Sequence, residues 1–230
     1  MLVLTWNLFH GRALPPQSRS LYPEFAAKLH EWRWDLALLQ EVPPWWPAAL
    51  ARELGVEQRC ALTSRNSLPA LRRAVAERRP ELIKSNGGGC NAILSRLPIR
   101  EHRVLTLRRR PERRVAQLVR LSDRTHVVNL HAGTSPARAE DELARLSWHA
   151  LSWSRGEPLI LGGDLNLTAP QAPLQHLAGH HVDHLLAEGF LPAGEASLPD
   201  RTIAHRGRFE LSDHAALLLE LRAGSVGLSR

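Results

Sequence analysis

The chain has 230 residues, of which 43% are hydrophobic, and it carries a formal net charge of +7 at pH 7. A chain of this length buries about 70–75% of the surface that it exposes when unfolded, so its core needs no disulfide framework. We expect the two cysteines, Cys60 and Cys90, to be reduced thiols. No apolar run approaches the ~20 residues that span a bilayer, and a strand-like run follows Met1 directly. The sequence therefore predicts a cytoplasmic protein with no membrane span and no cleaved signal.

The basic residues are almost all arginines, and they gather in two groups. Arginine makes bidentate contacts to phosphate, so these groups could bind a polyanion such as nucleic acid. A general bias toward arginine would produce the same composition, since Lys28 and Lys84 are the only lysines, and both interpretations stay open. The groups contain Arg72, Arg73, Arg78, Arg79 and Lys84, and Arg100, Arg103, Arg108, Arg109, Arg110, Arg113 and Arg114.

The first part of the chain predicts alternating helices and strands. Residues 22–34 place apolar side chains at helical spacing and lead into an apolar strand at 35–39. Two prolines, Pro43 and Pro44, break the chain after that strand. The pattern then predicts a helix at 46–54, a strand at 56–62 and a short surface helix near 68–79.

The second part begins with a predicted meander of short strands at 92–94, 104–107, 115–121 and 126–130. Ser135 and Pro136 indicate the start of a helix that continues to Trp153, with acidic residues at 140–142 where the helix dipole favours them. Strands follow at 159–161, 182–186 and 215–221, and the stretch 192–209 is interpreted as irregular. No repeat or long linker divides the chain, so we expect one domain over 1–222 and a C-terminal tail over 223–230.

Five of the apolar runs meet polar or acidic residues where strand ends are expected. A continuous apolar run is typical of a buried strand, and in open α/β sheets the site lies outside the carboxyl ends of such strands. The fifth run is reversed, as in an antiparallel strand that enters from the same rim. The spacing therefore predicts one convergent polar cluster in an α/β fold. The residues at these ends are Asn7, Gln40, Glu41, His131, Asp164, Asn166, Asp213 and His214.

The oxygen donors in this set suit a hard divalent cation. Mg²⁺ is typically bound by one or two carboxylates together with water and substrate phosphate. Glu41 and Asp213 supply carboxylates, and Asn7 can add an amide oxygen. Oxygen ligands with histidines beside them favour Mg²⁺ or Mn²⁺ over structural zinc.

The remaining polar residues can move or hold protons. Asp164 can orient or deprotonate a water, Asn166 can hold that water or a phosphoryl oxygen, and His131 and His214 can donate to a phosphate or a leaving oxygen. Simpler interpretations exist for each residue alone. Asp164 and Asn166 could form a capping turn, and a single histidine beside a strand is commonly part of the core.

Seven short motifs occur together in one order along the chain. They are Thr5-Trp-Asn7, Leu39-Gln-Glu41, Gly89-Cys-Asn91-Ala-Ile-Leu-Ser-Arg96, Asn129-Leu-His131, Gly162-Gly-Asp-Leu-Asn166, Val182-Asp-His184 and Ser212-Asp-His214. This ordered set resembles the endonuclease/exonuclease/phosphatase family over essentially the whole length of the chain. The resemblance implies an α/β (α+β) fold of two packed mixed β-sheets flanked by helices, a four-layer sandwich, and metal-activated hydrolysis of phosphoesters.

The same resemblance implies a role for each matched residue. It places Asn7, Glu41 and Asp213 at the metal, Asp164 on the attacking water, and Asn166 on the phosphate. It pairs His214 with Asp183 beside the scissile phosphate, puts His131 at a position that holds His or Tyr, and makes Asn91 a residue on the substrate side. The neighbouring histidines, His180, His181 and His184, are interpreted as structural or surface residues.

These observations favour a Mg²⁺- or Mn²⁺-dependent phosphodiesterase, foremost a nuclease acting on DNA or RNA. One alternative is a hydrolase of lipid headgroups or other small phosphoesters, because those substrates are anionic as well. A non-catalytic nucleic-acid-binding module is the alternative from another class, and it fits poorly with an intact acidic cluster. The oligomeric state stays open.

Overall fold

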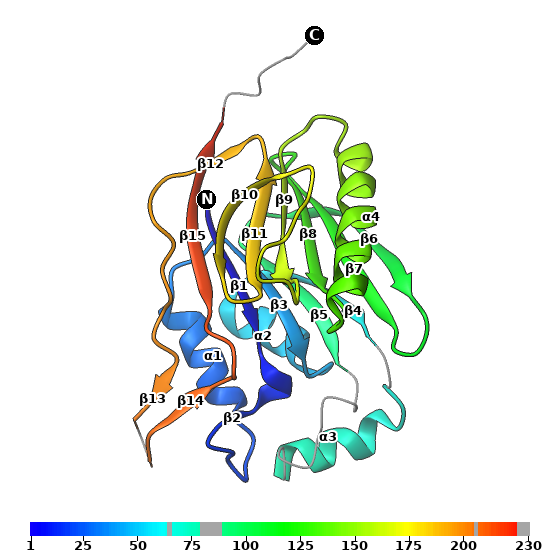
Figure 1. Cartoon of the computed structure of the whole chain (residues 1–230). Coiled ribbons are helices and arrows are strands. Elements are labelled where there is room, and N and C mark those ends of the chain that lie inside the picture. The colour runs from blue at the N-terminus through cyan, green and yellow to red at the C-terminus, as the bar shows by residue number, and fades with distance from the viewer. Residues whose placement is uncertain (64–65, 79–88, 205–206, 225–230) are drawn as a thin grey trace.

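The computed structural model describes residues 1–63, 66–78, 89–204 and 207–224. Two six-stranded sheets form the centre of the fold (Figure 1). The first contains β12 (Phe190–Pro192), β15 (Leu217–Ala223), β1 (Leu2–Asn7), β3 (Leu36–Val42), β5 (Cys90–Ser95) and β4 (Glu57–Leu62), in that order. The second contains β10 (Gln175–His180), β11 (Asp183–Glu188), β9 (Leu159–Asp164), β8 (His126–His131), β7 (Arg114–Leu121) and β6 (Ile99–Arg108). A small third sheet joins β13 (Thr202–Ile203), β14 (Phe209–Leu211) and β2 (Ala13–Leu14).

Three apolar clusters show how the layers stack. The first sheet packs against α1 (Tyr22–Glu31) and α2 (Trp46–Leu54), and the second packs against α4 (Pro136–Ser154). A third cluster lies between the sheets, where Leu38 of β3 and Ile160 of β9 are both fully buried. This confirms the predicted four-layer sandwich. The remaining helices are α3 (Pro69–Arg78) and the short η1 (Phe9–Gly11).

The central strands are apolar on both faces because each lies between a helix layer and the opposing sheet. β3 is parallel to β1, and β9 is parallel to β8. A hydrogen bond between Asn7 at the end of β1 and Asp164 at the end of β9 joins the two pairs, so all four strands end at the same rim. β15 is antiparallel to β1 and begins at that rim, as the reversed order of its polar and apolar residues predicted.

Several elements differ from the sequence prediction. The first helix ends at Glu31 because Trp32 is extended and the Trp34 indole donates to the carbonyl of Leu29. β10 was not predicted, and the stretch 192–209, interpreted as irregular, contains β13 and the start of β14. These strands are short or half-exposed, so they lack the apolar runs that identify buried strands.

The helix after Pro136 shows a further difference. Ser135 is extended at its N-terminus but makes no capping hydrogen bond through its side chain, and the first turn contains no acidic residue. Glu142 is instead buried and accepts a hydrogen bond from the backbone of Gly133 at 2.7 Å. This carboxylate therefore holds the segment that follows β8 against α4.

Both cysteines are free thiols, Cys90 buried and Cys60 partly so. Among the described residues, no helix has the length and apolar character required to cross a bilayer. The expected C-terminal tail lies outside the described residues from 225 onward.

Candidate functional site at the shared strand rim

Asp164, the last residue of β9, is the hub of the polar cluster. Its Oδ2 accepts a hydrogen bond from Nδ2 of Asn7 at 2.9 Å. The same oxygen lies 3.4 Å from Nε2 of His131 and 3.8 Å from Nε2 of His214. The structure thus brings together four of the predicted residues from β1, β8, β9 and the segment before β15, and Asp164 is 2% exposed.

Strand register explains this convergence. Asp164 has two register partners, His131 on β8 and Asp183 on β11. Gly163 has a φ of 137°, and a Cβ built there would lie 1.9 Å from the carbonyl oxygen of Leu130. Only glycine fits this close approach, so Gly163 fixes the path of β9 immediately before Asp164.

His214 and Asp183 form an ion pair beside the hub. Nδ1 of His214 lies 2.7 Å from Oδ2 of Asp183. Burial alone would lower the pKa of His214, but the hydrogen bond and the charge of Asp183 raise that pKa to about 9. His214 is therefore cationic at neutral pH, and its Nε2 remains free to donate toward the site.

His131, unlike His214, is a neutral imidazole at neutral pH. It is 7% exposed, and burial lowers its pKa although Asp164 opposes that change. The guanidinium of Arg114 lowers the pKa of His131 further. The site therefore combines a neutral imidazole with a charged one, and the two can take different proton-transfer roles.

Glu41 is the next-to-last residue of β3 and has a left-handed backbone conformation, with a φ of 50°. Burial raises the pKa of Glu41, but the contact with His10 and the guanidinium charge of Arg12 outweigh it and lower that pKa to about 2. Nε2 of His10 lies 3.1 Å from Oε2 of Glu41. The glutamate is therefore an ionised carboxylate, as a cation ligand must be.

The third predicted ligand, Asp213, is exposed, with 38% of its side chain accessible, and the partial loss of its hydration raises its pKa. Asp213 interacts electrostatically with Glu41 and with Arg12, so the two carboxylates share one charge environment. Within the described part of the chain, no three His, Cys, Asp or Glu residues form a ready metal cage. The donor set of two carboxylates and the amide oxygen of Asn7 suits Mg²⁺, which retains waters and takes phosphate oxygens as ligands.

Asn166 forms the turn that the simpler interpretation anticipated. Its backbone N–H donates to Oδ1 of Asp164 at 3.1 Å, and its Nδ2 donates to the carbonyl of Ala132 at 3.0 Å. This turn holds Asp164 in place, so a structural role and a place at the site coexist for Asn166.

Asn91 is fully buried between the sheets, where its Nδ2 donates to the carbonyl of Val115 at 3.1 Å. Gln40 and Asn129 make a similar link, 2.8 Å long, between the two sheets. Such buried amide contacts specify how the sheets align. Asn91 therefore joins the sheets immediately below the rim.

Two residues that the sequence analysis did not select also belong to the site. His10 lies in η1, Arg12 directly follows η1, and both interact with Glu41. No motif marks them, because their position depends on the left-handed backbone at His10, where φ is 55°. In the sequence, the only indication of a role for them is that a histidine and an arginine closely follow the strand that ends at Asn7.

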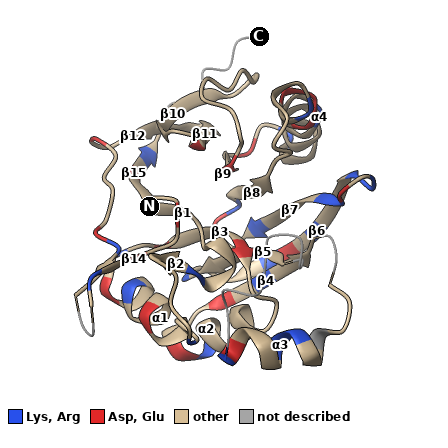
Figure 2. Cartoon of the chain, turned by 60° about the horizontal axis from the view of Figure 1, so that its bottom comes forward, with Lys and Arg blue, Asp and Glu red and all other residues tan. Residues whose placement is uncertain are grey.

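A hollow of about 380 Å³ adjoins the site. It is lined by His180 at the end of β10, by His181 in the turn to β11, by Arg201 in the stretch before β13, and by Asp213 and His214. His184, by contrast, is buried and lies 2.7 Å from the carbonyl of Leu167, as expected for a structural histidine. Figure 2 turns the rim toward the viewer and shows basic residues near the tip of the β6–β7 hairpin and on α3.

Solved structures share this architecture. Over 98% of this chain and 72% of the other, it is similar to an endonuclease/exonuclease/phosphatase from Beutenbergia cavernae DSM 12333 (19% identity, TM-score 0.65). A mannosyl-6-phosphatase from Bacteroides thetaiotaomicron matches over 96% of this chain and 99% of its own (15% identity, TM-score 0.69). Truncated TDP2 from Caenorhabditis elegans matches over 96% and 97% (15% identity, TM-score 0.67).

No curated protein matches the chain in sequence. The sequence pattern of the endonuclease/exonuclease/phosphatase family, however, matches residues 4–214, which include every residue of the site described above. The chain belongs to the endonuclease/exonuclease/phosphatase family.

Proposed function

We propose that this protein is a divalent-metal-dependent phosphodiesterase, and foremost a nuclease that hydrolyses DNA or RNA. Members of its family are phosphoester hydrolases. The observation that carries the proposal is the Oδ2 atom of Asp164, on which Asn7, His131 and His214 converge within 3.8 Å. A buried carboxylate with several nitrogen groups around one oxygen is suited to binding and orienting a water molecule.

In this proposal Asp164 aligns the attacking water and accepts its proton. The hydrogen bond from Asn7 fixes the carboxylate in one orientation. Asn166, held by its own two hydrogen bonds, contacts the phosphate. Both residues would hold the water and the phosphate in the geometry of the reaction. Such positioning speeds a reaction, because the loss of translational and rotational freedom occurs on binding and not in the chemical step.

His214 is proposed to donate a hydrogen bond from Nε2 to the phosphate or to the leaving oxygen. Asp183 keeps it cationic and fixes its orientation through Nδ1. His131 is neutral and faces the same carboxylate, so it can accept a proton or hydrogen-bond a phosphate oxygen through a protonated nitrogen. Stabilising charge that develops in the transition state is commonly a major part of such catalysis.

Glu41, Asp213 and the amide oxygen of Asn7 are the proposed ligands of Mg²⁺, with Mn²⁺ as a substitute. A bound divalent cation would polarise the phosphate and neutralise developing negative charge. The ionised state of Glu41 supports this assignment, because a carboxylate with a low pKa remains available as a ligand over a wide pH range.

A nucleic-acid substrate is supported by arginines near the rim. The β6–β7 hairpin has Arg109 and Arg110 at its exposed turn, and α3 carries the partly exposed Arg73. Such groups would contact a phosphodiester backbone on both sides of the scissile bond. A small phosphoester is the second candidate, favoured by the 380 Å³ hollow beside His214 and by the fold shared with a mannosyl-6-phosphatase.

A parallel assay of supercoiled plasmid, abasic duplex, RNA, sphingomyelin and inositol phosphates separates these candidates. Each substrate is tested with Mg²⁺, with Mn²⁺ and with a chelator. Cleavage of a polynucleotide that stops with chelator supports the nuclease, whereas turnover of headgroups alone supports the second candidate. Salt-sensitive DNA binding without turnover of any substrate would leave a binding module and contradict the proposal.

A further inference from the structure

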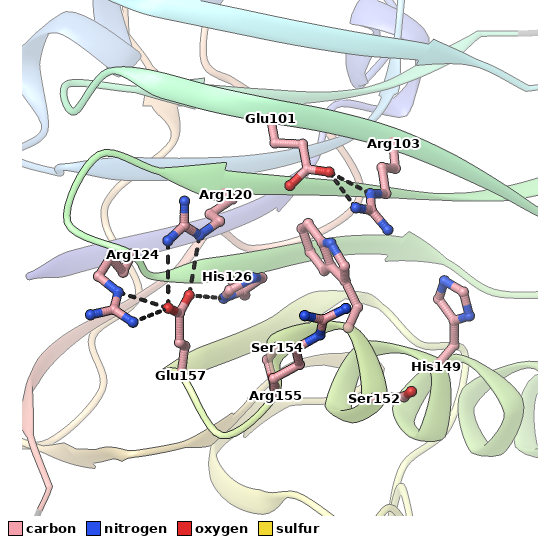
Figure 3. Close-up of a pocket in the computed structure, with 11 residues that line it drawn as sticks. Glu101, Arg103, Arg120, Arg124, His126, His149, Ser152, Ser154, Arg155 and Glu157 are labelled. Carbon is pink, nitrogen blue, oxygen red and sulfur yellow. Dashed lines mark hydrogen bonds and ion pairs between the residues drawn. The ribbon is translucent and has the colours of Figure 1, made fainter.

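A larger hollow, of about 690 Å³, lies at the opposite end of the second sheet from Asp164 (Figure 3). It is bounded by His126 at the start of β8 and by Glu157 just before β9, whereas His131 and Asp164 stand at the far ends of those strands. The last two turns of α4 and the outer face of β6 form its other walls. We refer to it as the distal hollow.

Positive charge exceeds negative charge in the distal hollow. Its lining contains four arginines, Arg103, Arg120, Arg124 and Arg155, and two glutamates, Glu101 and Glu157. Arg120 and Arg124 both contact the carboxylate of Glu157, at 3.1 and 2.7 Å. Hydrogen bonds from these two arginines lower the pKa of Glu157 to about 2. One wall therefore already binds an oxyanion between two guanidinium groups.

Another part of the lining has basic side chains that lack such a partner. Among the described residues, the side chains of Arg155 and His149 make no hydrogen bond or ion pair, and both line the hollow. Arg103 contacts Glu101, and its guanidinium also lies 5.2 Å from the ring centre of Trp153. Figure 3 shows Arg103, Arg155 and His149 around one part of the hollow, apart from the Glu157 cluster.

Two of these arginines occupy backbone positions that glycine or asparagine usually takes. Arg155 ends α4 with a φ of 52°, and Arg124 has a φ of 73° in the turn between β7 and β8. A left-handed conformation is unfavourable for a residue with a Cβ, because the Cβ approaches the following carbonyl oxygen. The chain thus places Arg124 and Arg155 at the hollow in spite of a local conformational cost. Unfavourable backbone conformations of this kind cluster at functional sites.

We propose that the distal hollow is a second anion site that binds a phosphate group, with Arg155 and His149 as its free ligands and Arg103 beside them. A guanidinium can hold two phosphate oxygens at once, and the volume is large enough for a mononucleotide. The phosphate could belong to a free nucleotide or to a nucleic-acid strand. This site is separate from the rim that contains Asp164, which we call the catalytic rim, so it does not depend on the proposed hydrolysis.

The test is a titration followed through the indole N–H signal of Trp153 in ¹H–¹⁵N spectra, assigned with a Trp153→Phe variant. The intact protein, with chelator present, is titrated with inorganic phosphate, with adenosine 5′-monophosphate and with a phosphorothioate oligonucleotide. We expect a saturable shift of this signal, and Arg155→Gly should weaken the apparent affinity about tenfold or more. Glycine suits the backbone at this position, so the variant should fold at least as well as the parent.

Two further variants keep the test decisive. Arg155→Asn removes the guanidinium but retains a side chain that tolerates the left-handed conformation, so it should reproduce the loss. Arg33→Gln removes an exposed arginine elsewhere and should change nothing. Tighter binding of the oligonucleotide than of the mononucleotide would identify a strand as the source of the phosphate. A Trp153 signal that none of the three probes moves, or equal affinity in Arg155→Gly and the parent, would overturn the site.

Discussion

The two ends of the second sheet use charged residues in different ways. At the catalytic rim Asp164 is 2% exposed and its neighbours converge on it from separate strands. At the distal hollow the ion pairs are open to water, and the side chain of Arg124 is 69% exposed. Exposed pairs contribute little to stability, whereas buried groups must be satisfied and therefore keep fixed positions. The difference agrees with the two proposals, which assign chemistry to the first end and reversible binding to the second.

The largest expected effect is on the buried hub. Asp164→Asn keeps the shape of the side chain but removes its charge and its capacity to accept a proton, so the rate of DNA cleavage should fall by roughly 10²–10⁴-fold. Asp141→Asn, on the exposed face of α4, is the matched control and should cleave at the parent rate. Near-normal cleavage by Asp164→Asn in a folded protein would remove Asp164 from the mechanism.

The next effect concerns the cationic histidine. His214→Gln can still donate one hydrogen bond but carries no charge, and we expect a loss of about 10²–10³-fold in kcat. Asp183→Asn should lower kcat less, and it should move the alkaline limb of the pH–rate profile to lower pH because the pKa of His214 falls without its partner. An unchanged alkaline limb in Asp183→Asn would contradict the assigned pairing.

A smaller effect is expected for the metal ligand. Glu41→Gln replaces an ionised carboxylate by a neutral amide, so the Mg²⁺ concentration for half-maximal activity should rise, with activity partly restored at high Mg²⁺. Glu53→Gln, at the exposed end of α2, is a comparable control. Identical metal titrations for Glu41→Gln and the parent would remove Glu41 from the ligand set.

The smallest effect is on stability in the metal-free protein. The pKa of His214 is raised from 6.5 to about 9, so its contribution is fully present below pH 6.5 and is lost as the pH rises through about 9. Asp183 has a raised pKa of about 6, so its own titration lies below this window. The free energy of unfolding should therefore fall more between pH 7 and 10 in the parent than in Asp183→Asn or His214→Gln. Denaturant unfolding at both pH values checks this, and parallel curves for all three proteins would refute it.

The sequence was most informative where strands are buried. The apolar runs that end at Asn7, Glu41, His131 and Asp164 located the central strands, because burial on both faces demands such runs. The same logic placed their final residues at one rim. Half-exposed strands such as β10 lack this pattern and were missed.

Details of the site were harder to predict, because they depend on backbone geometry and on distant contacts. The left-handed conformation at His10 brings that side chain to Glu41, and neither residue type signals it. His131 is neutral because it is buried, and His214 is cationic because it pairs with Asp183. Only the folded chain defines these surroundings. Asn91 was placed on the substrate side by resemblance, and its contact with Val115 became visible only once the sheets were packed.

The central claim is that Asp164 and the groups around it form a metal-activated site that breaks a phosphodiester bond. Hydrolysis of bis(p-nitrophenyl) phosphate tests it most directly, because this small diester requires no recognition of a particular substrate. We predict turnover by the parent protein with Mg²⁺ or Mn²⁺, and loss of that turnover with chelator and in Asp164→Asn. Turnover that persists with chelator, or that is equal in the parent and in Asp164→Asn, would contradict the claim.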